Sequence, residues 1–155
     1  MRISVLFLTL SLSLLSNPAF SQNAAEISAV VTDREAAITE LIAQYLGTRA
    51  QNNEQGLLAL LTEDIDQLTT SGNLRSGRAA VSNGSLATTR SNSGERSITV
   101  ETIRFVRTDV AMVNAHYDIV DRSNGPDLHY LTSILVVMDD ERWLISAIRN
   151  MQPTQ

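Results

Sequence analysis

The stretch Tyr130–Met151 reads YLTSILVVMDDERWLISAIRNM, and it decides the fold. Two apolar runs rich in β-branched residues flank the dipeptide Asp139-Asp140, which predicts a β-hairpin with an acidic two-residue turn. Because both faces of this hairpin carry apolar side chains, we expect it at the centre of a sheet, packed on helices on one side and enclosing a space on the other. The turn predicts these facing pairs on one face: Val136 with Trp143, Ile134 with Ile145, Thr132 with Ala147, and Tyr130 with Arg149.

The first residues have the pattern of a cleavable export signal. Arg2 supplies a positive charge, Ile3–Leu15 is an apolar run, and Ala19-Phe20-Ser21 has the small-x-small pattern of a cleavage site. The apolar run is shorter than the roughly 20 residues that span a membrane, so we expect no stable membrane anchor. We predict a signal peptide over residues 1–21 and a periplasmic or secreted protein of one domain, residues 22–155, with an ordered core over about 32–151.

The composition excludes several kinds of chemistry. The chain has no cysteine, so it has no disulfide and no thiolate nucleophile. All 12 basic residues are arginine, and the absence of lysine excludes Schiff-base chemistry. Removing Arg2 leaves 11 basic against 17 acidic residues, 11 − 17 = −6, and this acidity argues against nucleic acid as a partner. His116 and His129 have no second ligand at a metal-binding spacing, so we predict neither a metal site nor a cofactor.

Helical patterns dominate the first half of the mature chain. Residues 22–31 are predicted to be a mobile lead-in, and Thr32 with Glu35 forms a capping box that starts a helix running to about Asn52. Asn53 is expected to cap a second, shorter helix. A short strand over residues 65–70, a turn, and a third helix over about 79–88 follow.

Strand patterns dominate from residue 97 onward. The phase of the apolar alternation changes at Glu101-Thr102, which predicts a β-bulge. In the strand 110–120 the odd-numbered side chains are apolar throughout, whereas the even-numbered ones become polar towards Asp118. Helices that come first and antiparallel strands that come second predict the α+β class.

This order of elements resembles the SnoaL-like group of the nuclear transport factor 2-like superfamily. The resemblance rests on Leu57–Asp64, Gly72–Val81 and Trp143–Asn150, and it covers nearly all of the mature chain. It implies three N-terminal helices packed on a strongly curved mixed or antiparallel sheet, which forms a cone with an apolar pocket. Members include isomerases, cyclases, hydrolases and dehydratases as well as binding and assembly domains, so the fold alone does not choose a function.

The ketosteroid isomerases of this superfamily are similar to the chain without gaps from Tyr45 to Gly72. The resemblance places their oxyanion-hole tyrosine at Tyr45, their general-base aspartate at Thr69, and their protonated oxyanion acid at Ile134. Proton abstraction next to a carbonyl needs a base and hydrogen-bond donors for the enolate. Because threonine is no base near neutral pH and isoleucine has no proton to donate, we predict that ketosteroid isomerase activity is absent.

Four further residues are candidates for the pocket. Tyr130 and Arg149 would form a clamp for an anion or a carbonyl, or a stacked pair at a wet end of the sheet. His116 would be a general base oriented by Asp118, or a polar residue at a solvent-facing strand end. Trp143, the only tryptophan, is expected in the core or in the pocket wall.

The sequence supports three hypotheses about function. The first is an exported protein that binds a small apolar or amphipathic molecule and has no assignable catalysis. The second is an isomerase, dehydratase or hydrolase that uses Tyr45 with His116 or Arg149. The third is a structural module that forms a homodimer through its sheet and has a vestigial pocket. A base inside the cone separates the second hypothesis from the first, and the volume of the pocket separates the third.

Overall fold

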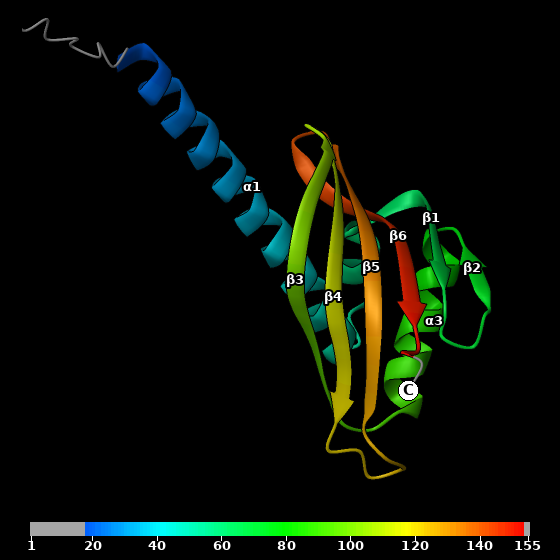
Figure 1. Cartoon of the computed structure of the whole chain (residues 1–155). Coiled ribbons are helices and arrows are strands. Elements are labelled where there is room, and N and C mark those ends of the chain that lie inside the picture. The colour runs from blue at the N-terminus through cyan, green and yellow to red at the C-terminus, as the bar shows by residue number, and fades with distance from the viewer. Residues whose placement is uncertain (1–17, 154–155) are drawn as a thin grey trace, which may run out of the picture. The chain divides into compact units, whose positions relative to one another are not determined.

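The computed structural model describes residues 18–153 (Figure 1). The chain divides into two units, one ending at Thr32 and one beginning at Asp33, and each is described by itself. Most of the predicted signal peptide, residues 1–17, lies outside the described part of the chain.

The first helix begins earlier than the sequence predicted. Helix α1 spans Pro18–Ala50, so residues 22–31 are helical and the predicted mobile lead-in is wrong. Thr32 is not a cap either, because its hydroxyl donates to the carbonyl of Ser28 one turn back inside the helix, at 3.0 Å. Residues 22–31 hold three alanines and no glycine or proline, which favours a continuous helix. A proline is well tolerated in the first turn, so Pro18 suits the start.

The second unit contains the rest of the secondary structure. The predicted cap of the second helix is confirmed, because the Asn53 side chain accepts a hydrogen bond from the Gly56 amide at 2.9 Å. The elements after α1 are α2 (Glu54–Ala59), β1 (Leu61–Leu68), β2 (Leu74–Ser76), α3 (Arg78–Ser91), β3 (Glu95–Arg107), β4 (Val110–Val120), β5 (Leu128–Asp139) and β6 (Arg142–Met151).

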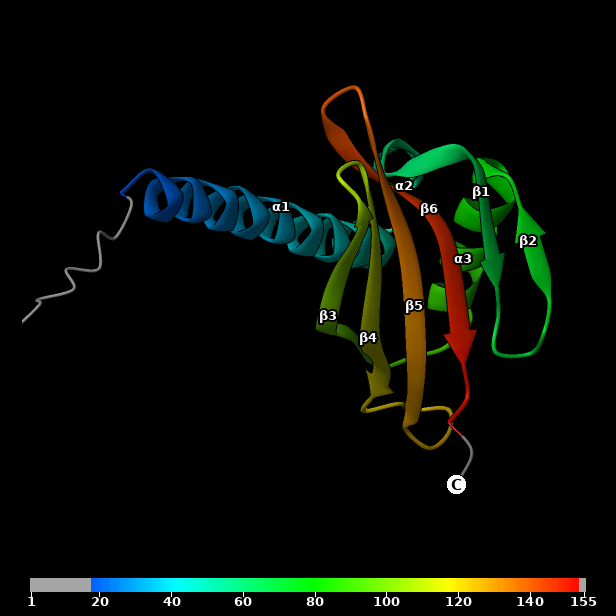
Figure 2. The same ribbon diagram turned by 45° about the horizontal axis from the view of Figure 1, so that its top comes forward.

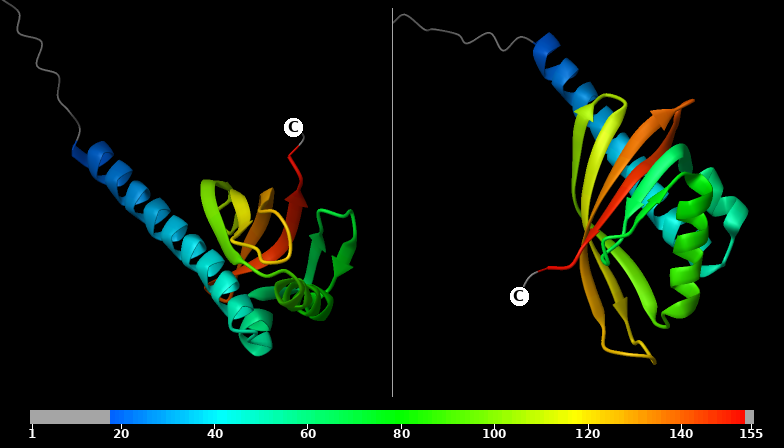
Figure 3. Two further views of the ribbon diagram at one scale, coloured as in Figure 1. Left: turned by 90° about the horizontal axis from the view of Figure 1, so that it is seen from below. Right: turned by 90° about the vertical axis from the view of Figure 1, so that its right-hand side faces the viewer.

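The strands form one mixed sheet in the order β2-β1-β6-β5-β4-β3. Only β1 and β6 pair in parallel, and all other neighbours are antiparallel. Figures 1 and 2 show the helices of this unit on one side of the sheet, and Figure 3 shows the sheet curving around them. The register of β3 against β4 shifts between Val100 and Thr102, which confirms the predicted bulge. The α+β class and the cone-like fold are confirmed.

The central hairpin has a different register from the one predicted. Its turn is Asp140-Glu141, with φ of 44° and 62°, the positive angles that a type I′ turn requires. Trp143 therefore faces Met138 instead of Val136. The hairpin also contains one bulge, at Ser146, because Leu135 pairs with Ala147 whereas Val136 pairs with Ile145.

The extra residue at this bulge changes the side of the sheet to which the last side chains of β6 point. Ile148 points into the core, and Arg149 faces Ser133 on the other side of the sheet. The predicted pair of Tyr130 with Arg149 is wrong, because the β5 residue opposite Arg149 is Ser133. The sequence shows why the bulge is needed: only a bulge turns both Ile145 and Ile148, three residues apart, to the same side.

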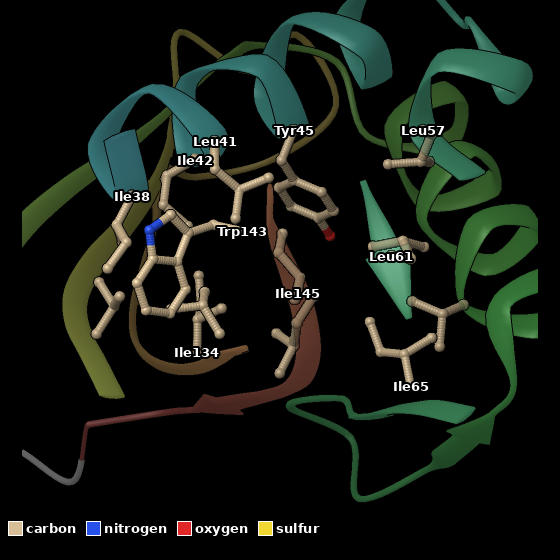
Figure 4. Close-up of a cluster of buried hydrophobic side chains, with 14 of the residues drawn as sticks. Ile38, Leu41, Ile42, Tyr45, Leu57, Leu61, Ile65, Ile134, Trp143 and Ile145 are labelled. Atoms are coloured by element: carbon tan, nitrogen blue, oxygen red, sulfur yellow. The ribbon is translucent and has the colours of Figure 1, made fainter. Parts of the chain in front are cut away.

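The hydrophobic core fills one end of the cone. Trp143 packs against Phe105 with ring centroids 6.1 Å apart, and Figure 4 shows Trp143 close to Ile38, Ile42 and Ile134. An apolar stripe of α1 supplies the helical side of this core, and its side chains are almost completely buried: Ile38, Leu41, Ile42 and Tyr45. The apolar side chains therefore pack as a solid core at this end of the sheet.

Candidate functional site

A cavity of about 210 Å³ lies beside the core, at the end of the sheet where α3 faces β1 and the strands β4 to β6. Its wall is mainly polar and is rich in hydroxyl and amide groups, whereas the sequence predicted an apolar pocket. Ile119, Leu128 and the rings of Tyr117 and Tyr130 give it one apolar side. The lining residues are Arg49, Gln67, Thr69, Thr70, Ser71, Asn73, Arg75, Ser85, Thr88, Asn92, Tyr117, Ile119, Leu128, Tyr130 and Asn150.

Arg49, from the last turn of α1, is the most deeply buried charged residue of this wall. Only 5% of its surface is exposed. Its guanidinium donates to the hydroxyls of Tyr45 at 3.4 Å, Tyr117 at 3.3 Å and Thr89 at 3.2 and 3.3 Å. It also lies over both tyrosine rings, 5.2 Å from the centroid of Tyr45 and 5.8 Å from that of Tyr117. All of these partners are neutral groups.

A buried cation without a carboxylate is unusual, because removing it from water costs several kcal/mol. Burial lowers the pKa of the Arg49 guanidinium, but the hydroxyls of Tyr45 and Tyr117 offset this effect, and the pKa lies above its ordinary value. Arg49 is therefore positively charged at every physiological pH, and it presents that charge to the cavity.

A small void continues beyond Arg49 towards the core. It is shared by Tyr45, Ile98, Thr132, Ile134 and Ile148, and it holds about 10 Å³. Arg49, Tyr117 and Asn150 line both spaces. Asn150 accepts a hydrogen bond from the Thr132 hydroxyl at 2.9 Å, and Tyr45 is 3.4 Å from the hydroxyl of Ser85. These residues form a polar floor between the open cavity and the solid core.

Arg75 brings a second cation to the cavity from β2. It donates to the Gln67 side chain at 2.9 Å and to the Thr88 hydroxyl at 3.4 Å, again to neutral groups. The side chain crosses α3 over Gly84, where an added Cβ would lie 2.4 Å from the Arg75 Nε. A glycine in the middle of a helix costs about 1 kcal/mol relative to alanine, and here it makes room for the guanidinium.

The structure brings only part of the predicted site residues together. Thr69 and Tyr130 line the cavity. Tyr45 and Ile134 line the small void beyond it, and both side chains are almost fully buried. Trp143 does not line the cavity and lies in the core, against Phe105.

His116 and Arg149 lie on the opposite face of the sheet. His116 alternates with the buried Ala115 and Tyr117, and its side chain is 48% exposed and 2.9 Å from Glu101. Arg149 forms a two-pronged ion pair with Asp66, at 2.8 and 2.9 Å. Neither side chain reaches the cavity, so neither acts there as a base or a clamp.

Asp118, which the sequence suggested as the partner that orients His116, instead contacts His129 at 2.8 Å. Two separate pairs of histidine and carboxylate therefore lie on the outer face of the sheet, His116 with Glu101 and His129 with Asp118. Within residues 18–153, no three His, Asp or Glu side chains gather closely enough to hold a metal ion.

Sequence reasoning missed Arg49 and Arg75, the two charged residues of the cavity. A signal for Arg49 was present, because it follows Tyr45 by four residues and therefore shares its face of α1. The position of Arg75 had no such signal, since it depends on the pairing of β2 with β1, which lets the side chain cross α3. Tyr117 was found as part of the apolar face of β4, but not as a partner of Arg49.

No family model matches the chain, and no curated protein matches it. In the described part of the chain, no helix combines the length and apolarity that crossing a membrane requires.

Solved structures match the fold over most of the chain. A domain of unknown function with a cystatin-like fold from Nostoc punctiforme is 20% identical, with 78% of each chain covered and a TM-score of 0.67. An NTF-2 like protein of unknown function from Shewanella oneidensis is 18% identical, with 77% of this chain and 99% of that chain covered and a TM-score of 0.65. A ketosteroid isomerase-like protein from Erwinia carotovora is 12% identical, with 77% and 96% covered and a TM-score of 0.65. These identities establish the fold and no more, and the chain therefore has the nuclear transport factor 2-like fold that its sequence resembled.

Proposed function

We propose that this protein is an exported binding protein that takes a small amphipathic molecule into the cavity beside Arg49. The observation that carries the proposal is the cavity itself, a space of about 210 Å³ with polar donors on one side and Ile119, Leu128 and aromatic rings on the other. A ligand of this size is smaller than the drug-sized molecules that fill pockets of about 300–1,000 Å³.

The arrangement favours binding over proton-transfer catalysis. A general base must lie within hydrogen-bond reach of the proton that it removes. His116, the best candidate base in the sequence, lies on the other face of the sheet. Thr69 and Ile134 stand at the positions that the ketosteroid isomerase resemblance assigns to an aspartate base and a protonated acid. The groups that do line the cavity are hydroxyls, amides and guanidinium groups, which hold a ligand by donating hydrogen bonds.

The test compares two tryptophan substitutions at neighbouring positions of β5. Leu128 lines the cavity, whereas His129 is exposed on the opposite face. Leu128→Trp should fill the cavity and remove co-purifying small molecules from the exported protein, as measured by native mass spectrometry followed by extraction. His129→Trp should keep them. Equal ligand content in the two variants would contradict binding in this cavity.

The export prediction remains part of the proposal. Its support is the pattern of Arg2, Ile3–Leu15 and Ala19-Phe20-Ser21. Cleavage after Ser21 would leave α1 starting at Gln22 in the mature protein. Mass spectrometry of the periplasmic or secreted protein should find Gln22 at its N-terminus, and an intact chain found only in the cytoplasm would contradict export.

We also propose that two copies associate through the outer face of the sheet. Val110, Met112, Leu135 and Val137 form facing pairs on this face, and all four are only partly buried within one copy. Covering them by a second copy would remove apolar surface from water. Light scattering should give a dimer mass for the wild-type protein and a monomer mass for Leu135→Arg, and a wild-type monomer would contradict the proposal.

A further inference from the structure

The cavity concentrates positive charge in a protein that is acidic as a whole. The full chain has 17 acidic and 12 basic residues. Two arginines, Arg49 and Arg75, are among the residues that line the cavity, and the described residues of its wall include neither aspartate nor glutamate. A concave site with charges of one sign attracts ligands of the opposite sign.

All three guanidinium nitrogens of Arg49 have hydrogen-bond partners, but every partner is a neutral hydroxyl and the contacts are long. Its guanidinium is 3.2–3.4 Å from the hydroxyls around it. Arg149, on the other face of the sheet, approaches the carboxylate of Asp66 at 2.8 and 2.9 Å. Bonds between a guanidinium and a carboxylate are short, at about 2.7–2.9 Å. Arg49 therefore differs from Arg149 in having no short, charge-assisted contact to a carboxylate among the described residues.

We infer that the ligand of the cavity is a small organic carboxylate whose anionic group binds Arg49. This inference rests on the proposed ligand-binding function and names the chemical class of the ligand. The carboxylate supplies a negative charge, which none of the hydrogen-bond partners of the buried guanidinium provides. Its organic part lies against Ile119, Leu128 and the ring of Tyr130, on the apolar side of the cavity.

The position of Arg75 supports the same class of ligand independently. Its guanidinium is held against Gln67 and Thr88 by neutral partners, and Gly84 gives it space on the surface of α3. The glycine that makes room for this guanidinium lowers the stability of the helix. The second cation would repel a cationic ligand and would not attract a neutral one. For an anion, it adds attraction from a second direction.

The experiment measures how strongly the cavity prefers a carboxylate over its neutral amide. Isothermal titration calorimetry of the purified exported protein would compare butyrate, hexanoate and benzoate with butyramide, hexanamide and benzamide. The members of each pair match in shape and differ in charge. We expect the best carboxylate to bind at least about tenfold more tightly than its amide, since the charges of Arg49 and Arg75 attract the anion and not the neutral amide.

Two arginine substitutions make the matched comparison. Arg49→Met should abolish the carboxylate preference and leave the melting temperature of the free protein equal or higher, because a buried cation without a counter-ion gives way to an apolar side chain. Arg149→Met removes an arginine from the outer face and should leave the preference unchanged. Should Arg49→Met fail to fold, Arg75→Met at a half-buried position should still reduce the preference.

The outcomes distinguish a failure of the carboxylate inference alone from a failure of the proposed binding function. Amides that bind as tightly as carboxylates to the wild-type protein would overturn the inference and leave the binding cavity intact. A preference that survives in both Arg49→Met and Arg75→Met would also overturn it. Failure of every compound in both series to bind would count against the binding function and the inference together.

Discussion

The two ends of the cone differ in how their interior is filled. At one end, Trp143, Phe105 and the apolar stripe of α1 fill the interior. At the other end, Arg49 and Tyr117 stand at the floor of a cavity of about 210 Å³. The closed end is built for stability, whereas the open end keeps a buried charge whose partners are only hydroxyls. This difference is the basis of our proposal that the open end holds a ligand.

The largest effect is expected from a substitution in the closed end of the cone, and it is a loss of stability. Trp143→Ala would leave a large void among Ile38, Phe105 and Ile134, and we expect it to lower the free energy of unfolding by about 3–5 kcal/mol. Urea denaturation would measure the loss. Trp143→Phe is the control, and it should cost clearly less because an aromatic ring still fills most of the site. A cost below about 1 kcal/mol for Trp143→Ala would show that this end is not the solid core.

The next effect concerns pH at the open end. Arg49 has a pKa above its ordinary value, so its charge does not change between pH 4 and pH 9. A free carboxylic acid has a pKa of about 4–5 in water. The anion is the form that we infer Arg49 binds. Affinity for benzoate should therefore be constant above about pH 6 and fall by about tenfold for each pH unit below the pKa of the acid.

Calorimetry across this pH range would test the prediction, with benzamide as the compound whose affinity should not change. A rise in benzoate affinity on acidification would mean that the neutral acid is bound, which would remove the role given to Arg49.

A smaller effect is expected when Arg75 is displaced without being removed. In Gly84→Ala the new Cβ would lie 2.4 Å from the Arg75 Nε, so the side chain must leave its place on α3. Alanine favours the helix by up to about 1 kcal/mol, so the protein should not lose stability. Carboxylate affinity should fall by about threefold, which is about 0.6 kcal/mol. A clear loss of stability, with unchanged affinity, would show that Arg75 is structural only.

The smallest effect is expected on the outer face of the sheet. The ion pair of Arg149 with Asp66 is partly exposed, with 40% and 32% of the two side chains accessible. Removing it by Arg149→Met should cost at most about 1 kcal/mol of unfolding free energy. Ligand affinity should not change, since Arg149 lies across the sheet from the cavity. Thermal unfolding and the same calorimetric titration would measure both quantities.

Local patterns predicted the strands and the α+β class, whereas the cone-like arrangement was an expectation from the family resemblance. The apolar runs on each side of the final turn and the change of phase at Glu101-Thr102 specify strands and a bulge by alternation alone. The capping-box pattern at Thr32 predicts a later start for α1 than the structure has. The helical propensity of the alanine-containing residues before Thr32 outweighs that pattern.

The site was less predictable because it depends on register. A single bulge beside Ser146 moves Arg149 to the outer face and separates it from Tyr130. Arg49 takes its importance from groups that are 40 and 68 residues away, at Thr89 and Tyr117, and from the lack of a carboxylate near them in the cavity wall. No sequence pattern predicts which charged side chains will lack an oppositely charged partner after folding.

The most direct test of the central claim is a crystal structure of the exported protein with the carboxylate that binds most tightly in calorimetry. We predict that the carboxylate oxygens lie about 2.7–2.9 Å from the guanidinium nitrogens of Arg49, with the organic group against Leu128 and Tyr130. A carboxylate bound on the outer face of the sheet, or one that lies in the cavity with its charge directed away from Arg49, would contradict the account.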